Sequence, residues 1–221
     1  FIMSNILIIS PHPDDETLGC GGMIFKYREY KRKIYWLIMT EMKKNQYNLK
    51  QINQRKKIIS AVYKQYQFQD IFQLKYPTGM LDKINISEII DAIKSIISKI
   101  SANIVYIPFH DDIHTDHKIT FNASISATKN FRQKSIKNIY MYETLSETNY
   151  SPIDSFKPNV FINITDYFQK KIDILNLYQT ELKEHPFPRS LKSIEALAVL
   201  RGSQSAYKYA EAFQLIKEMI D

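Results

Sequence analysis

Short runs rich in β-branched and aromatic residues alternate along the chain with longer runs of helical periodicity, and this alternation constrains the fold most. Such an order indicates parallel strands joined by right-handed crossovers. We therefore expect an α/β fold with a doubly wound, mostly parallel sheet and helices on both faces, in a Rossmann-like three-layer sandwich. The expected strands are Ile6–Ser10, Ile34–Thr40, Asp70–Leu74, Ile104–Ile107, Ile139–Tyr142 and Val160–Ile164.

The clearest helical pattern lies between Ser87 and Ile100, where isoleucines recur at the spacing of a single apolar stripe. We expect Ser87 to be its N-cap. Near the end of the chain, Gly202 is expected to stop one helix and Ser203 to cap the next. The expected helices are Gly21–Tyr30, Gln51–Gln65, Ser87–Ile100, His117–Phe131, Asp166–Leu182, Leu191–Leu200 and Gln204–Ile220.

Chemically active residues gather directly after the first and fourth expected strands. Pro11-His12-Pro13-Asp14-Asp15-Glu16 follows the first strand, and His110-Asp111-Asp112-Ile113-His114-Thr115-Asp116-His117 follows the fourth. Four of the chain's five histidines lie in these two segments. In doubly wound sheets, ligands bind beyond the carboxyl ends of the strands where the strand order reverses, so we expect the functional site there.

Imidazole and carboxylate ligands suit zinc, which in catalytic sites has three protein ligands and a water. The two segments supply more carboxylates than one ion needs, which leaves one free to act as a base. A dinucleotide site is the competing interpretation of a strand followed by glycines. Gly19, Gly21 and Gly22 do not match G-x-G-x-x-G, and the acidic run Asp14–Glu16 would repel a pyrophosphate.

The chain has 30 Lys and Arg against 23 Asp and Glu, a net charge of +7. Six of these basic residues and no acid lie between Lys43 and Lys57, on the rim expected to hold the site. One interpretation is contact with a phosphate, such as that of a nucleotide-sugar; the other is a solvated face. Nucleic-acid binding would need aromatic platforms or a known module beside the charge, and we do not expect it.

The remaining features indicate an ordinary globular chain. Its length of 221 residues fits one domain. The single cysteine, Cys20, excludes an intrachain disulfide and is expected to be a small residue near a helix start rather than a ligand. No apolar run approaches the roughly 20 residues of a membrane span, and no secretory signal is evident. We expect a cytoplasmic protein without membrane contact.

At the two segments the sequence resembles the PIG-L/LmbE family of zinc-dependent N-acetylglucosaminyl deacetylases. The hallmark (A/P)HPDDE stands as Pro11 to Glu16, and H-x-D-H stands as His114 to His117, with Asp112 upstream. The resemblance continues to the end of the chain and implies one such domain over residues 3–221. Its further motifs are Tyr142-Glu143, Phe161–Thr165, His185–Ser190, Arg201–Ser203 and Tyr209–Phe213.

The resemblance implies a role for each matching residue. His12, Asp15 and His117 would bind zinc, or another divalent ion such as iron or cobalt, and Asp14 would be the general base. A cationic His114 would stabilise the oxyanion or protonate the leaving amine, and Asp116 would orient a histidine. His110 is expected to be a bystander, and Asp112 either caps its loop or supports the metal site.

The residues expected to bind substrate are less well defined by the resemblance. Arg55 is a candidate, although the family often has a glutamate three residues after this arginine and Ile58 stands here. Arg189 is another candidate. It lies in the loop His185–Ser190, which either faces the substrate or another subunit or only connects two helices. The same alternatives apply to Arg201.

The resemblance implies a hydrolase that removes the acetyl group from an N-acetylated amino sugar, a sugar conjugate or a nucleotide-sugar and releases acetate. The alternatives are a zinc hydrolase of another amide or ester, a catalytically idle metal- or sugar-binding protein, and a phosphate- or nucleic-acid-binding protein. A self-associating surface, and hence a homo-oligomer, is compatible with the sequence.

Overall fold

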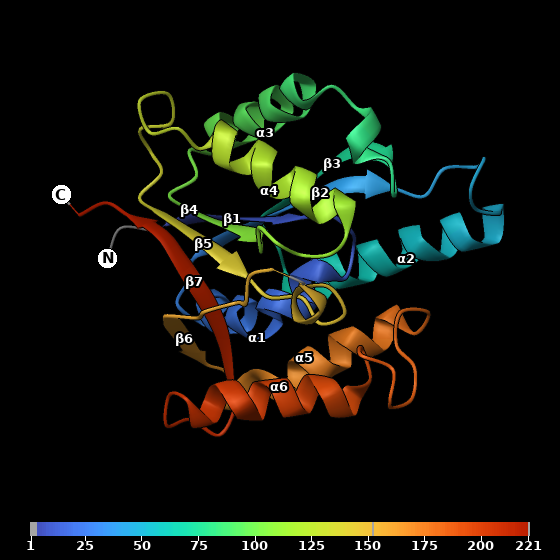
Figure 1. Ribbon diagram of the computed structural model, residues 1–221, viewed down its shortest axis with the longest axis vertical. Helices are drawn as coiled ribbons and strands as arrows, with labels where there is room; N and C mark the ends of the chain where they lie inside the picture. Colours follow the sequence, from blue (N-terminus) through green and yellow to red (C-terminus); the bar gives the residue numbers. More distant parts are fainter. Residues whose placement is uncertain (1–3, 152, 221) are drawn as a thin grey trace.

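The computed structural model describes residues 4–151 and 153–220, and a seven-stranded sheet in the order β3-β2-β1-β4-β5-β7-β6 runs through its centre (Figure 1). Strands β1 to β5 are parallel to one another, and β7 is antiparallel to both β5 and β6. All six expected strands are confirmed. Their bounds are β1 Asn5–Ser10, β2 Lys33–Glu41, β3 Asp70–Pro77, β4 Ile104–Pro108, β5 Asn138–Tyr142 and β6 Val160–Asn163, with β7 at Ala210–Glu218.

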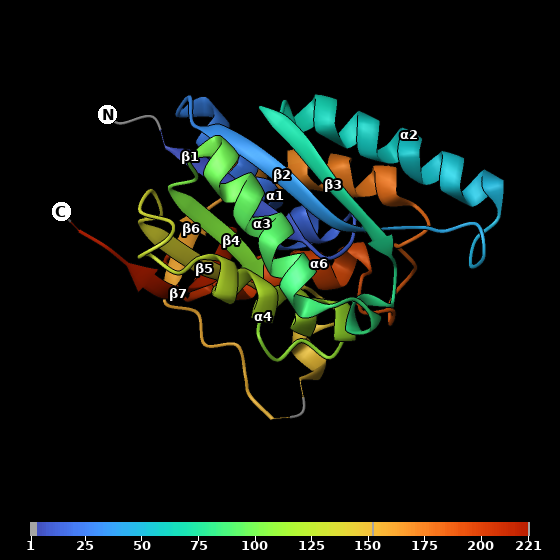
Figure 2. The same cartoon turned by 90° about the horizontal axis from the view of Figure 1, so that it is seen from above.

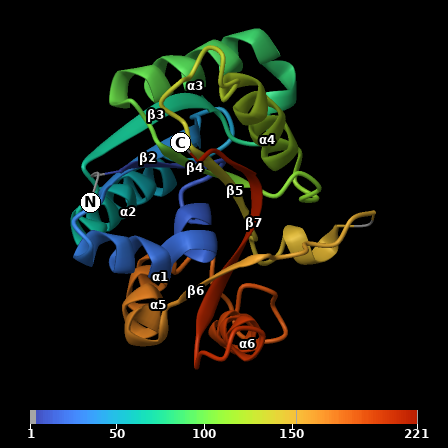
Figure 3. The same cartoon turned by 90° about the vertical axis from the view of Figure 1, so that its left-hand side faces the viewer.

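Helices cover both faces of the sheet, so the expected doubly wound, mostly parallel α/β sandwich is confirmed (Figures 1 and 3). Helices α3 and α4 lie on one face; α1 and α2 lie on the other, with α5 and α6 on the same side. The alternation along β1 serves both layers, because Leu7 and Ile9 pack with α3 and α4 while Ile6 and Ile8 pack with α1 and α2. The helix bounds are α1 Asp15–Glu29, α2 Leu49–Tyr66, α3 Ile86–Ile100, α4 Thr115–Ala127, α5 Phe168–Leu175 and α6 Leu191–Ser203.

The strand order reverses at β1. The chain leaves β1 to form β2 and β3 on one side, then returns to place β4 on the other side of β1. The loops that follow β1 and β4 therefore separate at this point and leave room for a site above the sheet. This is the position that the sequence predicts for the functional residues.

The expected last helix, Gln204–Ile220, is wrong: the segment turns and forms strand β7. The first four residues of β7 are all buried, Glu211 among them, so the strand has no alternation of apolar and polar residues in its sequence. Gly202 lies inside α6 rather than at its end, and a Cβ there would lie 2.5 Å from the carbonyl oxygen of Tyr207, so the returning chain requires glycine. Ser203 is the last residue of α6 and caps no further helix.

Several helix ends also differ from expectation. Helix α1 begins six residues earlier than predicted, at Asp15, so the acidic segment forms its first turn, where carboxylates suit the helix dipole. The N-cap of α3 is Asn85, which accepts the backbone N–H of Ser87. Helix α4 begins two residues early and ends at Ala127, and α5 is shorter than predicted, so Glu181 lies outside it.

A buried ion pair ties β7 to α1. The Glu211 carboxylate accepts the backbone N–H groups of Gly22 and Met23 at 2.8 and 2.7 Å. Lys171 lies 2.7 Å from the same carboxylate and donates to the carbonyl of Leu18 at 2.8 Å. Both buried charged side chains therefore have hydrogen-bond and ion-pair partners.

Within residues 4–151 and 153–220, none of the helices combines the length and apolar character of a membrane span.

Candidate metal centre

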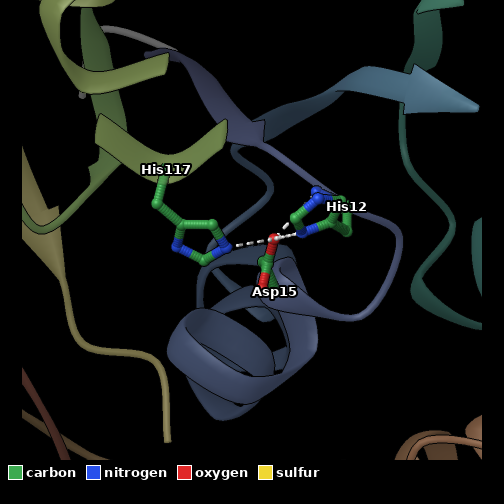
Figure 4. A group of neighbouring side chains, drawn as sticks. All are labelled: His12, Asp15 and His117. Carbon is green, nitrogen blue, oxygen red and sulfur yellow. Dashed lines mark hydrogen bonds and ion pairs between the residues drawn. The ribbon is translucent and has the colours of Figure 1, made fainter. Parts of the chain in front are cut away.

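His12, Asp15 and His117 converge at the switch point (Figure 4). His12 belongs to the loop after β1, Asp15 is the first residue of α1, and His117 lies in the first turn of α4. Asp15 Oδ2 lies 3.5 Å from His12 Nδ1 and 3.4 Å from His117 Nε2. One ligand atom from each of the three residues lies within 4.8 Å of the others.

This donor set fits a divalent ion such as zinc. Two ligand atoms held tetrahedrally at about 2.1 Å from one ion are roughly 3.4 Å apart, close to the observed separations. The second nitrogen of each imidazole contacts a carboxylate: His12 Nε2 lies 2.9 Å from Asp116 Oδ2, and His117 Nδ1 lies 2.7 Å from Asp112 Oδ2. Imidazole ligands in metal sites are commonly oriented by such carboxylates.

The two orienting carboxylates are themselves fixed. Asp116 accepts the backbone N–H groups of Gly79 and Leu81, at 2.7 and 3.0 Å, from the segment after β3. Asp112 accepts the hydroxyl of Thr148 at 2.6 Å. The sequence left two interpretations of Asp112, a loop cap or a support of the metal site. The hydrogen bond of Asp112 to His117 favours the second.

The electrostatics of the cluster favour a cation. Burial would lower the pKa of His12, but hydrogen bonds to Asp116 and Asp15 outweigh burial and raise that pKa to about 9. The pKa of His117 is also raised, because Asp15 and Asp112 outweigh the effect of burial. Burial opposes ionisation of Asp15, yet His117 and His12 hold its pKa well below the usual range. Positive charge is therefore stabilised where a divalent ion would lie.

Asp14 lies beside this cluster with an unusual backbone. Its φ of 145° is in a region that favours glycine, and its N–H donates to Glu16 Oε2 at 3.0 Å. The other oxygen of Glu16 accepts the hydroxyl of Tyr178 at 2.8 Å, so a buried network holds the strained residue. Burial and the neighbouring Asp15 raise the pKa of Asp14 to about 7.

His114 differs from expectation in its charge. Its Nδ1 accepts the backbone N–H of Asp116 at 3.0 Å, which requires the proton of a neutral ring to lie on Nε2. Burial, together with His12 and His117, lowers the pKa of His114 to about 4. The expected cationic His114 is therefore wrong for this structure, because two histidines of higher proton affinity lie beside it. His114 could also form a ligand group with His12 and Asp116.

A cavity of about 310 Å³ opens onto these residues. Both predicted substrate-binding arginines line it: Arg55 from α2, and Arg189 from the loop before α6. Arg189 Nη1 lies 3.2 Å from Asp14 Oδ2, and Arg55 donates to the carbonyl of Pro13 at 2.7 Å. All eight predicted site residues thus lie in one region of the molecule.

The profile of the PIG-L family, described as GlcNAc-PI de-N-acetylase, matches residues 7–128, which contain both histidine segments. The chain belongs to the PIG-L family. A curated relative of this PIG-L chain, the diacetylchitobiose deacetylase of Thermococcus kodakarensis, is 20% identical over 97% of the chain and 84% of the relative.

Solved structures confirm the fold of this PIG-L protein. The N,N'-diacetylchitobiose deacetylase of Pyrococcus horikoshii matches with a TM-score of 0.78 and 20% identity, over 97% of this chain and 84% of that one. GalB, the 4-carboxy-2-hydroxymuconate hydratase of Pseudomonas putida, matches with a TM-score of 0.77 and 15% identity, over 99% and 98%. Because a hydratase shares the fold with a deacetylase, the chemistry must be argued from the site.

The sequence reasoning missed Glu181, which links the two arginines. Its carboxylate pairs with Arg55 through one oxygen and lies 3.6 Å from Arg189 Nη2 through the other. Ile58 stands where a glutamate often follows the PIG-L arginine, so the partner of Arg55 comes from a distant segment. The sequence held no signal for Glu181, because the partial burial of Arg55, which calls for a carboxylate partner, is visible only in the folded chain.

The other residues that the sequence singled out lie in different parts of the structure. His110 lies outside the cluster and 3.2 Å from Asp154, as expected of a bystander. Cys20 is buried in the core within α1. Arg201 pairs with Glu143 and does not line the 310 Å³ cavity. Of the six basic residues from Lys43 to Lys57, Arg55 and Lys56 line that cavity.

Proposed function

We propose that this protein is a metal-dependent hydrolase that removes the acetyl group from an N-acetylated amino sugar or sugar conjugate and releases acetate. The observation that carries the proposal is the convergence of His12, Asp15 and His117 beside a separate carboxylate, Asp14. Membership of the PIG-L family and the deacetylase named among the relatives support the choice of an acetamide as substrate.

In this proposal His12, Asp15 and His117 hold one divalent ion, with zinc the ion that best suits two imidazoles and a carboxylate. When bound, such an ion polarises the amide carbonyl and lowers the pKa of an adjacent water. Asp14 accepts the proton of that water as it attacks the carbonyl carbon. A pKa of about 7 suits this role, since the carboxylate is ionised near neutrality and still basic enough to take the proton.

His114 contributes as a neutral hydrogen-bond donor. With Nδ1 occupied by the Asp116 N–H, its Nε2–H is left to donate to the carbonyl oxygen as negative charge develops there. Asp14 then returns its proton to the amide nitrogen, the carbon–nitrogen bond breaks, and acetate and a free amine leave. Arg189 keeps Asp14 oriented through its contact with Oδ2.

Three alternatives use the same residues differently. The site could hydrolyse another amide or an ester, or bind metal and sugar without turnover. Asp14 and His114 argue against a purely binding role, because neither is needed by the three-ligand set. A hydratase reaction would add water without releasing acetate or amine, so product analysis separates it from the proposal.

The experiment is acetate and free-amine release from a panel of N-acetylglucosamine compounds: the free sugar, simple glycosides, and the nucleotide diphosphate form. Each compound is tested with zinc-loaded protein and with protein stripped by a chelator. The proposal expects equal amounts of acetate and amine, lost on stripping and restored by zinc. No release from any compound by protein that holds one equivalent of metal would contradict it.

A further inference from the structure

Arg189 divides its guanidinium between two carboxylates. Its Nη1 lies 3.2 Å from Asp14 Oδ2, and its Nη2 lies 3.6 Å from Glu181 Oε2. Its Nε–H is buried and has no hydrogen-bond acceptor among residues 4–151 and 153–220. Arginine commonly holds a single carboxylate through two parallel N–H groups. Here each of the two carboxylates has only one nitrogen of Arg189 beside it.

Glu181 is held in place from outside the loop that carries Arg189. Its other carboxylate oxygen, Oε1, pairs with Nη2 of Arg55, whose side chain is only 11% exposed. Nη1 of Arg55 donates to the carbonyl of Pro13 at 2.7 Å. The segment that contains Glu181 runs beside α2 (Figures 1 and 2), and the backbone N–H of Glu181 donates to the carbonyl of Tyr178 at 2.8 Å. Glu181 therefore has a fixed position between the two arginines.

This arrangement leaves Asp14 with one free oxygen. Oδ2 faces Arg189, and within the described part of the chain no group donates a hydrogen bond to Oδ1. The Asp14 side chain is only 6% exposed, and it lines the cavity of about 310 Å³. In the proposed function Asp14 takes a proton from water, and that step needs an oxygen without another donor. A guanidinium that closed on both oxygens would compete with the water.

We propose that Glu181 is a positioning residue: it holds Nη2 of Arg189, so the guanidinium cannot close on both oxygens of Asp14 and one oxygen stays available to the attacking water. The proposal rests on the deacetylase function proposed above. Glu181 acts through Arg189 and not on the reacting atoms. Arg55 supports Glu181 by fixing its other oxygen, so the two arginines of the cavity have different roles.

The test compares acetate release by four proteins with equal zinc content: wild type, E181Q, R189K and E181Q/R189K. E181Q keeps the shape of the side chain and removes its charge. R189K keeps a positive charge beside Asp14 but has no guanidinium fork, so it cannot hold two carboxylate oxygens in parallel. E184Q is the matched control, because Glu184 is an exposed glutamate of the same segment that does not line the 310 Å³ cavity.

We expect E181Q to lower kcat by about tenfold or more, up to the roughly 10²–10⁴-fold contribution of a general base. E184Q should leave kcat unchanged. In the R189K background, E181Q should change kcat by no more than about twofold, because no fork is left to close on Asp14. An equal effect of E181Q in both backgrounds, or no effect on the wild type, would overturn the proposal.

Crystal structures of the wild type and E181Q give a readout that does not depend on turnover. We expect both Nη1 and Nη2 of Arg189 to lie within hydrogen-bond distance of Asp14 in E181Q, and only Nη1 in the wild type. A single contact between Arg189 and Asp14 in E181Q would contradict the proposal. If the wild type releases acetate from no compound, the proposed function fails, and the two structures alone decide the role of Glu181.

Discussion

Asp116 Oδ2 lies 2.9 Å from His12 Nε2 and 2.7 Å from the backbone nitrogen of Gly79, so one carboxylate joins the segment after β3 to the candidate metal centre. The substitution Asp116→Asn removes the charge that orients the His12 ring. We expect zinc affinity to fall by about 10–100-fold, as for other residues that support metal-binding histidines.

The measurement is a competition titration with a chelator. Asp82→Asn is the control, because Asp82 is in the same segment after β3 and its exposed side chain pairs only with Lys83 among the ion pairs of the described residues. An unchanged zinc affinity in Asp116→Asn would show that the contact with His12 has no role in metal binding.

His114 can be tested as a hydrogen-bond donor rather than a ligand. We expect His114→Ala to lower kcat for acetate release by about 10²–10³-fold, the usual cost of one lost donor to a developing oxyanion. Metal content should stay at that of the wild type, because His12, Asp15 and His117 remain. The metal content of the variant is measured together with its kinetics. If His114→Ala loses its metal as well as its activity, His114 is a ligand and the prediction is wrong.

Metal binding should release protons. The pKa of His12 is about 9 without metal, so the ring is protonated at neutral pH and must lose its proton to bind an ion. Metal affinity therefore rises with pH up to about pH 9, because protons compete less for His12, and above that pH fewer protons are released. Calorimetry at about pH 7, in buffers of different ionisation enthalpy, should detect at least one released proton per metal. No proton release at that pH would contradict the protonation state derived from Asp116 and Asp15.

The alternation of strands and helices predicted most of the fold because packing on two faces of a sheet leaves a strong periodic signal. The failure at β7 has a specific cause. Glu211 is buried with Lys171 as its partner, and its neighbours along β7 are buried as well, so the strand lacks the apolar–polar alternation by which a strand is predicted from sequence. Tertiary pairing of this kind cannot be detected from local spacing.

That pair can be measured through stability. We expect Glu211→Ala to lower the free energy of unfolding by about 3–5 kcal/mol, because it leaves the Lys171 ammonium buried without a counter-charge. Asp91→Ala, which breaks the exposed pair with Lys94, serves as the control and should have little effect. Urea unfolding followed by circular dichroism compares the two; equal stability losses would contradict the account of the buried pair.

The candidate site could be predicted where its residues follow the ends of strands, and not where they come from irregular segments. The segments containing His12 and His117 lie at strand ends whose meeting follows from topology alone. Glu181 lies in an irregular segment after α5, and its contact with Arg55 depends on how that segment returns over α2. The neutral state of His114 likewise depended on a backbone hydrogen bond that only the folded chain shows.

The most direct test of the central claim uses the substitution Asp14→Asn in protein that carries the same amount of zinc as the wild type. The account predicts that acetate release falls by about 10²–10⁴-fold while metal content is unchanged, because a general base is lost and no ligand is. Asp111→Asn is the control, since this aspartate is in the second histidine segment but contacts Ser151 and the backbone of Asp154. Activity close to that of the wild type in zinc-loaded Asp14→Asn would contradict the account.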